Sequence, residues 1–220
     1  TVEAGRTVIV FTHIPGLGTA PMREGEGGPS ISGSITNRER LYRILEPYNA
    51  HLITGHTHEN EHVFEGGVHE HILGTACGAW WSGPICYDGT PSGYGVFDID
   101  GSNVSWRYKS TGMPFEHQLR VYPRGADPAS PNEIVANVWD ADPSWEVVWY
   151  EDGERKGPMA RRLGRDPLSV ELHIGPELPS HRPWVDPQVR YLFYAPVSPS
   201  ARSIRVEARD GMGRVYSAEM

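Results

Sequence analysis

Histidine side chains are concentrated in one short stretch of this chain of 220 residues. Six of its ten histidines lie between residues 51 and 71, and the densest group is the run Gly-His-Thr-His at residues 55–58. Neutral imidazole is a ligand of first-row divalent ions such as zinc, iron and nickel, and of manganese where carboxylates share the site. The spacing of His56 and His58 therefore predicts a metal site, although His-x-His pairs also occur on strands that bind no metal.

A third histidine, His13, is expected beside this pair. It follows a run of β-forming residues at 8–11 that is typical of a buried strand, and a second such run occupies residues 51–54. A helix is predicted between the two strands, because apolar residues repeat with helical spacing from residue 41 to residue 48. This order predicts a parallel pair of strands, whose carboxyl ends form one edge of the sheet. Open α/β sheets bind their ligands at that edge, so the three histidines are expected to converge there.

Five other polar residues could support such a site. His69 and His71 share one face of a predicted strand, where a structural role, or a role behind the metal ligands, is favoured over ligation. Glu59, Glu61 and Asp98 could orient the ligand imidazoles, but a solvated surface position is the favoured reading for each. None of the five is therefore expected to be a metal ligand itself.

The chain is expected to divide into two blocks of different architecture. Residues 1–118 are predicted to be an α/β block with added hairpins, because Gly-Gly and Asp-Gly turns separate alternating runs of residues. Residues 119–132 are rich in proline and are interpreted as a linker. Residues 133–220, including residues 168–173, are predicted to contain strands only, which indicates a small all-β sandwich of immunoglobulin-like size.

Several segments around these blocks carry further expectations. Residues 16–34 are rich in Gly, Ser and Pro, which predicts a long surface loop beside the active site. Trp80 and Trp81 point to opposite sides of an extended segment, so one can line a substrate cleft while the other is buried, and a purely structural role is left open. Cys77 and Cys86 could form a disulfide or remain as two buried thiols, and both readings stay open. The tryptophans expected in the core of the sandwich are Trp139, Trp145, Trp149 and Trp184.

The composition excludes some classes of protein. Hydrophobic residues make up 38% and charged residues 22% of the chain, which is enough apolar material for a buried core. The net charge of −8 argues against a general nucleic-acid-binding protein, which usually carries a basic stripe. No apolar stretch approaches the roughly eighteen residues of a membrane-spanning helix. We therefore expect a folded protein with no general affinity for nucleic acid and no membrane span.

The motifs at the predicted metal site resemble those of a known family. Phe-Thr-His-Ile-Pro at residues 11–15, followed by a helix and by Gly-His-Thr-His at residues 55–58, is similar to the last two motifs of the calcineurin-like metallophosphoesterases. The resemblance implies that His13, His56 and His58 are ligands of a two-metal centre. It also implies that the first block is part of a metallophosphoesterase β-sandwich with a helical layer.

Two further segments, at residues 75–83 and 88–94, resemble a bacterial subgroup in which a β-rich domain follows the catalytic domain. Residues 192–195 and 204–208 fit that β-rich domain, in agreement with the immunoglobulin-like sandwich expected at residues 133–220. Members of the subgroup are often exported, so a periplasmic or secreted location is expected.

The same resemblance implies a hydrolase that acts on phosphomonoesters or phosphodiesters through two divalent ions of manganese, iron, zinc or nickel. The substrate would be a phosphate ester, with Trp80 and Trp81 as candidate substrate-binding residues. The family's Asp-x-His, Gly-Asp-x-x-Asp and Gly-Asn-His-Glu motifs do not occur in this sequence. We therefore expect the chain to be a fragment that is inactive alone, with its catalytic residues in a missing N-terminal half of the same catalytic domain. The alternative is a non-catalytic module that binds glycan, cell wall or protein and carries remnant histidines.

Overall fold

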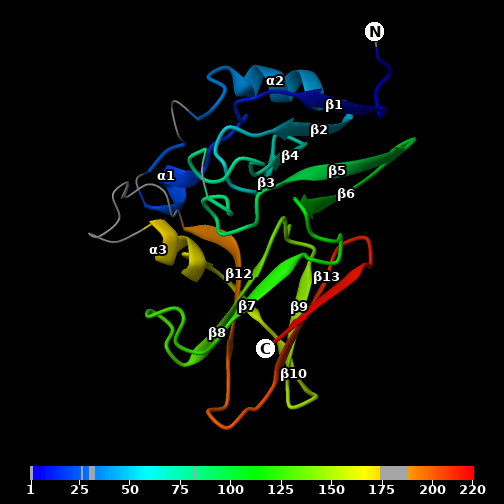
Figure 1. Ribbon diagram of the computed structural model, residues 1–220. Helices are drawn as coiled ribbons and strands as arrows, with labels where there is room; N and C mark the ends of the chain where they lie inside the picture. Colours follow the sequence, from blue (N-terminus) through cyan, green and yellow to red (C-terminus); the bar gives the residue numbers. More distant parts are fainter. Residues whose placement is uncertain (1, 26, 30–32, 82, 174–187) are drawn as a thin grey trace.

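The strands in the part of the chain that the structure describes form three four-stranded sheets and one two-stranded sheet (Figure 1). The computed structural model describes residues 2–25, 27–29, 33–81, 83–173 and 188–220. Only short helices accompany the sheets in these residues, so the described chain is β-rich. Within this part of the chain, no helix has the length and apolar character that crossing a membrane requires.

The first sheet has the strand order β1, β2, β4, β3. Its strands are β1 (Thr7–Phe11), β2 (Asn49–Thr54), β4 (Val68–Ile72) and β3 (Glu61–Glu65). β1 and β2 run parallel, and β3 and β4 form a hairpin, which confirms both predicted pairings. The turn residues Gly66 and Gly67 have positive φ angles of 56° and 76°, which glycine adopts because it has no Cβ.

Helix α2 (Arg38–Leu45) covers one face of this sheet, at the place where a helix was predicted. Tyr42 and Leu45 pack with Leu52 in one apolar cluster. β1 differs from the prediction of a buried strand. It lies at the edge of the sheet, so its residues are only half-buried and Phe11 is 71% exposed.

The opposite face of the first sheet is covered by the predicted hairpin of β5 (Gly93–Asp100) and β6 (Asn103–Ser110). The ring centroids of Trp106 and Phe97 lie 4.7 Å and 5.1 Å from that of His71. The sheet therefore lies between a helix and a hairpin (Figure 1). The imidazoles of the sheet and the indole of Trp106 meet in the contact with the hairpin.

The second block contains two four-stranded sheets that share one hydrophobic cluster. The first of them has the order β11 (Ala160–Gly164), β12 (Val189–Pro196), β8 (Glu133–Val138), β7 (Leu119–Tyr122). The other has the order β10 (Glu154–Pro158), β9 (Glu146–Glu151), β13 (Ile204–Arg209), β14 (Val215–Glu219). Leu192 from one sheet and Val206 from the other belong to the shared cluster, which is how two β layers form a common core. An immunoglobulin-like topology stays a prediction.

One predicted strand of the second block is a helix. Residues 168–173 belong to α3 (Pro167–His173). Oδ1 of Asp166 accepts the N–H of Ser169 at 2.9 Å, as an N-cap residue does, and proline is favoured at the first helical position. The prediction of strands only was therefore wrong here, because Asp166 and Pro167 start a helix.

Two predicted loops also contain regular structure. β7 lies within the segment 119–132 that was interpreted as a linker, and it pairs with β8. Segment 16–34, predicted to be a surface loop, contains helix α1 (Ala20–Arg23) and the buried side chains of Thr19 and Arg23. That prediction was wrong, because these polar side chains find ionic and hydrogen-bonding partners in the interior.

The tryptophans of the second block lie as expected where the structure describes them. Trp139 is fully buried, and its indole N–H donates to the carbonyl of His117 at 2.9 Å. Trp145 and Trp149 pack against the shared cluster. Trp184 lies outside the described residues.

The two cysteines are separate thiols, with Cys77 exposed and Cys86 buried. Burial, together with the nearby Asp88 carboxylate, raises the pKa of the Cys86 thiol to about 12. We therefore expect Ellman's reagent to modify only Cys77 rapidly in the native chain, and both thiols after unfolding in guanidinium chloride. Cys77→Ser should show no rapid reaction, whereas a second rapidly reacting thiol in the native protein would contradict the burial of Cys86.

Candidate metal centre

The carboxyl ends of β1 and β2 place His13 and His56 side by side. Beyond the two strands, the backbones remain joined by hydrogen bonds. The N–H of Thr12 donates to the carbonyl of Ile53 at 3.1 Å, and the N–H of Gly55 donates to the carbonyl of His13 at 3.1 Å. The two histidines therefore lie at the edge of the sheet where their convergence was expected.

The imidazoles of His13 and His56 are close enough to bind one ion. Nδ1 of His56 lies 3.1 Å from Nε2 of His13. Two nitrogens on one tetrahedral zinc ion are about 3.3 Å apart, given metal–nitrogen bonds of about 2.0–2.1 Å. Burial, followed by the neighbouring His13 and His58, lowers the pKa of His56. Its ring is therefore neutral at neutral pH and keeps a lone pair, so this donor set fits a divalent ion.

The backbone that carries these histidines has an uncommon conformation. His56 and His58 have positive φ angles of 71° and 57°, and Trp81 has a φ of 54°. Only a few per cent of non-glycine residues adopt this region, and they cluster at functional sites where the surrounding structure holds them. The N–H of Thr57 donates to the carbonyl of Gly55 at 2.8 Å, which closes the tight turn between the two histidines.

His58 is held differently from the other two predicted ligands. Its Nδ1 lies 2.8 Å from the carbonyl oxygen of Ala79, so Nδ1–H donates and Nε2 keeps the lone pair. Metal-binding histidines commonly donate their second N–H to a backbone carbonyl in this way. Within the described residues, however, His58 does not join His13 and His56 in a group whose ligand atoms all lie within 4.8 Å of one another. The structure therefore brings two of the three predicted ligands together.

Trp81 lies beside His58, and Trp80 contacts Trp81. Trp80 and Trp81 are 42% and 66% exposed, so neither is buried in a core. The ring centroid of Trp81 lies 5.2 Å from that of His58, at an angle of 77° between the planes. An exposed indole beside a candidate ligand is placed to contact a molecule bound at the histidines.

A buried carboxylate fixes the loop that follows His13. Glu70 accepts the N–H of Gly16 at 2.8 Å and that of Leu17 at 3.2 Å, and the hydroxyl of Thr54 donates to it at 3.0 Å. Glu70 lies on β4, so the loop after β1 is tied to the end of β2 through a third strand. Through Glu70, the loop that follows His13 is held beside the end of β2.

Glu59 and Glu61 bind a cation of their own chain instead of orienting the histidines. Arg23 reaches both, with its Nη2 at 2.5 Å from Glu59 and its Nη1 at 2.8 Å from Glu61. The hydroxyl of Thr19 donates to Glu61 at 2.6 Å. A solvated surface position is therefore wrong for these two glutamates, because α1 brings Arg23 to them. Asp98, by contrast, is exposed on β5.

Comparison with known proteins identifies the family. A family model described as the C terminal of calcineurin-like phosphoesterase matches residues 70–216, which is more than half of the chain. The chain belongs to the calcineurin-like phosphoesterases. Searches of curated proteins and of solved structures each found no match.

The resemblance inferred from the motifs of this calcineurin-like phosphoesterase is thereby confirmed. The matched residues run from β4 to β14, so His13, His56 and His58 lie before the matched segment. The family match and the histidine motifs are therefore separate observations that agree. Calcineurin-like phosphoesterases generally bind divalent metals and act on phosphate esters.

A second histidine group lies on the sheet face that the β5–β6 hairpin covers. Among the described residues, one group of three side chains has all its ligand atoms within 4.8 Å of one another, namely His51, His69 and His71. His51 pairs with His69 across β2 and β4, and His62 pairs with His71 across β3 and β4. The sequence alone did not indicate this group, because no run of residues marks the pairing of β2 with β4.

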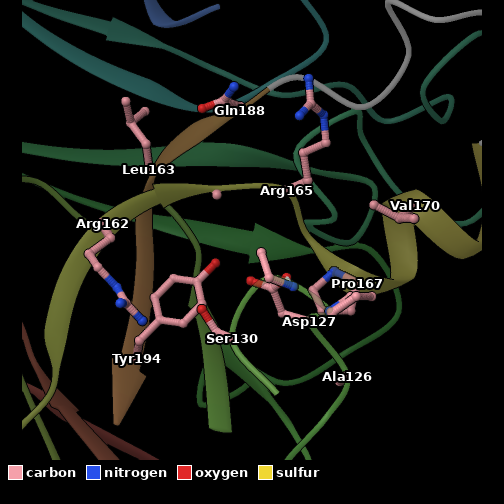
Figure 2. A pocket seen from close by; sticks show the side chains of 13 residues that line it. Ala126, Asp127, Ser130, Arg162, Leu163, Arg165, Pro167, Val170, Gln188 and Tyr194 are labelled. Carbon is pink, nitrogen blue, oxygen red and sulfur yellow. Dashed lines mark hydrogen bonds between the residues drawn. The ribbon is translucent and has the colours of Figure 1, made fainter. Parts of the chain in front are cut away.

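A hollow in the second block, shown in Figure 2, is less suited to a phosphate ester than the site at the strand ends. Its lining includes Arg162, Arg165 and Tyr194. Arg162 is paired with Glu133 and lies 4.0 Å over the ring of Tyr194, and Arg165 is paired with Glu24 at 2.8 Å. Because carboxylates already neutralise both cations, the hollow offers little positive charge to a phosphate group.

Proposed function

We propose that this chain supplies the histidine ligands of a two-metal centre that hydrolyses phosphate monoesters or diesters. The observation that supports the proposal most directly is the distance of 3.1 Å between Nε2 of His13 and Nδ1 of His56. These atoms lie at the carboxyl ends of parallel strands, where open α/β sheets bind their ligands. The family match supports the class of reaction.

Each histidine has a defined part in this proposal. His13 and His56 bind metal through the nitrogens that face each other, and His58 contributes Nε2 while the Ala79 carbonyl fixes its ring. The lowered pKa of His56 keeps its lone pair available at neutral pH. When bound, the ions activate water and neutralise the charge that develops on the phosphoryl oxygens. Trp81 offers its exposed ring to the organic group of the ester.

Carboxylate ligands are the second requirement of such a centre. Two-metal sites hold their ions roughly 3.5–4 Å apart, and three imidazoles by themselves do not supply enough ligands for two ions. The nearby carboxylates of this chain are already engaged, since Glu59 and Glu61 bind Arg23 and Glu70 binds the loop after β1. We therefore infer that the carboxylate ligands come from another segment of the same catalytic domain.

Metal binding by single-histidine variants tests the proposal. In the full-length protein, His13→Ala and His56→Ala should each weaken Mn²⁺ binding by at least about 100-fold, because loss of a ligand exceeds the 10–100-fold effect of losing a supporting residue. Hydrolysis of bis(p-nitrophenyl) phosphate should fall in parallel. Isothermal titration calorimetry measures the first quantity, and absorbance of the released p-nitrophenol measures the second.

His117→Ala is the matched control. His117 is a partly buried histidine with a lowered pKa, caused first by burial, and it packs against Trp139 at the junction of the two blocks. This variant should keep both metal affinity and activity. If His13→Ala and His56→Ala were folded and kept them too, the proposal would be wrong. A non-catalytic module that binds glycan, cell wall or protein would then be favoured.

A further inference from the structure

Four histidines on one face of the first sheet take no part in the site at the strand ends. His51 comes from β2, His62 from β3, and His69 and His71 from β4, and the strand registers place all four on one face. The ring of Trp106 on β6 contacts each of them, so the group lies under the β5–β6 hairpin. A strand rises about 3.3 Å per residue, so His51 lies on the order of 15 Å along the chain from His56. The two groups are therefore separate.

Three of these side chains are arranged like ligands of one ion. The ligand atoms of His51, His69 and His71 all lie within 4.8 Å of one another. Nδ1 of His51 is 2.9 Å from Nε2 of His71, and the rings of His69 and His71 stack with centroids 3.9 Å apart. Nitrogens on a tetrahedral zinc ion are about 3.3 Å apart, which is comparable to the separations in this group.

His51 and His71 are buried, and burial favours the neutral imidazole, which keeps a lone pair for an ion. His71 is fully buried, and among the described residues its Nδ1 has no hydrogen-bond partner. A buried polar atom without a partner is rare in native proteins, and an ion is one of the partners that accounts for it.

His62 contacts this group through His69. Its Nδ1 lies 2.9 Å from Nε2 of His69, and its Nε2 lies 3.1 Å from Oδ1 of Asp140. Metal-binding histidines commonly donate their second N–H to a partner that fixes the orientation of the ligand ring, and His62 is placed to be that partner of His69. Trp106 covers the group, with its ring centroid 4.7 Å from that of His71.

An opening reaches the group beside His51. The cavity there is lined by His51, by Asp98 and Asp100 of β5, and by Asn103 of β6. Its two carboxylates attract cations, so it provides a route of entry for an ion.

We propose that His51, His69 and His71 form a second metal site, which binds one zinc ion through three imidazoles and one water. Zinc suits this set because it is borderline in softness and prefers nitrogen ligands in a tetrahedral arrangement. The ion joins β2 to β4 beneath the β5–β6 hairpin. This site shares no residue with the centre at the strand ends, so it does not depend on the proposed phosphoesterase activity.

The test uses the full-length protein carrying His13→Ala and His56→Ala, which removes two ligands of the other centre. We expect this background protein to bind Co²⁺ with the visible d–d bands of tetrahedral coordination, and to melt at a higher temperature with zinc than without. Adding His69→Gln should weaken zinc binding by more than about 100-fold and abolish the thermal shift, whereas adding His62→Gln should weaken it about 10–100-fold.

His117→Gln in the same background is the control, and it should keep the zinc affinity. The proposal is overturned if the background protein binds no zinc, or if zinc binding survives both His69→Gln and His51→Gln. If His69→Gln fails to fold, His51→Gln replaces it. A tetrahedral Co²⁺ spectrum that either variant removes supports the site whatever the result of the phosphoesterase assay.

Discussion

Replacement of Arg23 by alanine is expected to lower the free energy of unfolding by about 3–5 kcal/mol. The side chain of Arg23 is 1% exposed and binds Glu59 and Glu61 at 2.5 Å and 2.8 Å. Burial opposes its charge, but the two carboxylates outweigh that effect and raise its pKa. Without the guanidinium group, two carboxylates remain buried next to each other. Urea unfolding followed by fluorescence measures the loss.

The control for this prediction is an arginine whose side chain is exposed to solvent. The side chain of Arg202 is 89% exposed and lies 4.0 Å from Asp152, so Arg202→Ala should leave the stability unchanged. A charge-free variant, Arg23→Leu with Glu59→Gln and Glu61→Gln, should recover a large part of the loss, because no buried charge is then left without a partner. A loss for Arg23→Ala no larger than that for Arg202→Ala would contradict the buried ion pairs.

Gly89→Ala is expected to lower the free energy of unfolding by about 2–5 kcal/mol. A left-handed residue with a Cβ costs about 1–2 kcal/mol, and overpacking of a buried site costs about 1–3 kcal/mol. Gly89 has a φ of 80°, and an added Cβ would lie 2.0 Å from Cγ of Asp166. Asp166 cannot move aside easily, because Tyr122, Asn137 and Ser169 all donate hydrogen bonds to it.

Gly153→Ala separates the two contributions in the same measurement. Gly153 has a φ of 85°, but an added Cβ there would have no neighbour within 4 Å. This control should therefore show only the backbone cost of about 1–2 kcal/mol. Equal losses for Gly89→Ala and Gly153→Ala would mean that the Asp166 side chain does not occupy the position described.

The elements of the first block could be predicted because each has a local signal. Apolar spacing marked α2, and the Gly66-Gly67 and Asp-Gly turns marked the two hairpins. The partial exposure of β1 could not be predicted, since a strand's place in the sheet depends on which strands pair beside it. The short helix α1 could not be predicted either, because the glutamates that bind the buried Arg23 lie 36 and 38 residues later in the chain.

The candidate site was predictable to a similar degree. His13 and His56 meet because they follow two parallel strands, which the order of elements already indicated. The orientation of His58 depends on the carbonyl of Ala79, and no sequence pattern near His58 indicates that contact. The histidine group around His71 required the cross-strand register of three strands, which residue spacing within one strand does not contain.

The left-handed backbone at His56 and His58 has a consequence for the strength of metal binding. A side chain that is ordered only when its ligand arrives loses conformational entropy at that moment, and the affinity falls accordingly. Here the turn from Gly55 to Thr57 and the Ala79 carbonyl restrict the two rings beforehand. In the proposed metal centre the entropy of ordering would therefore be lost during folding, and the two histidines would be preorganised for the ion.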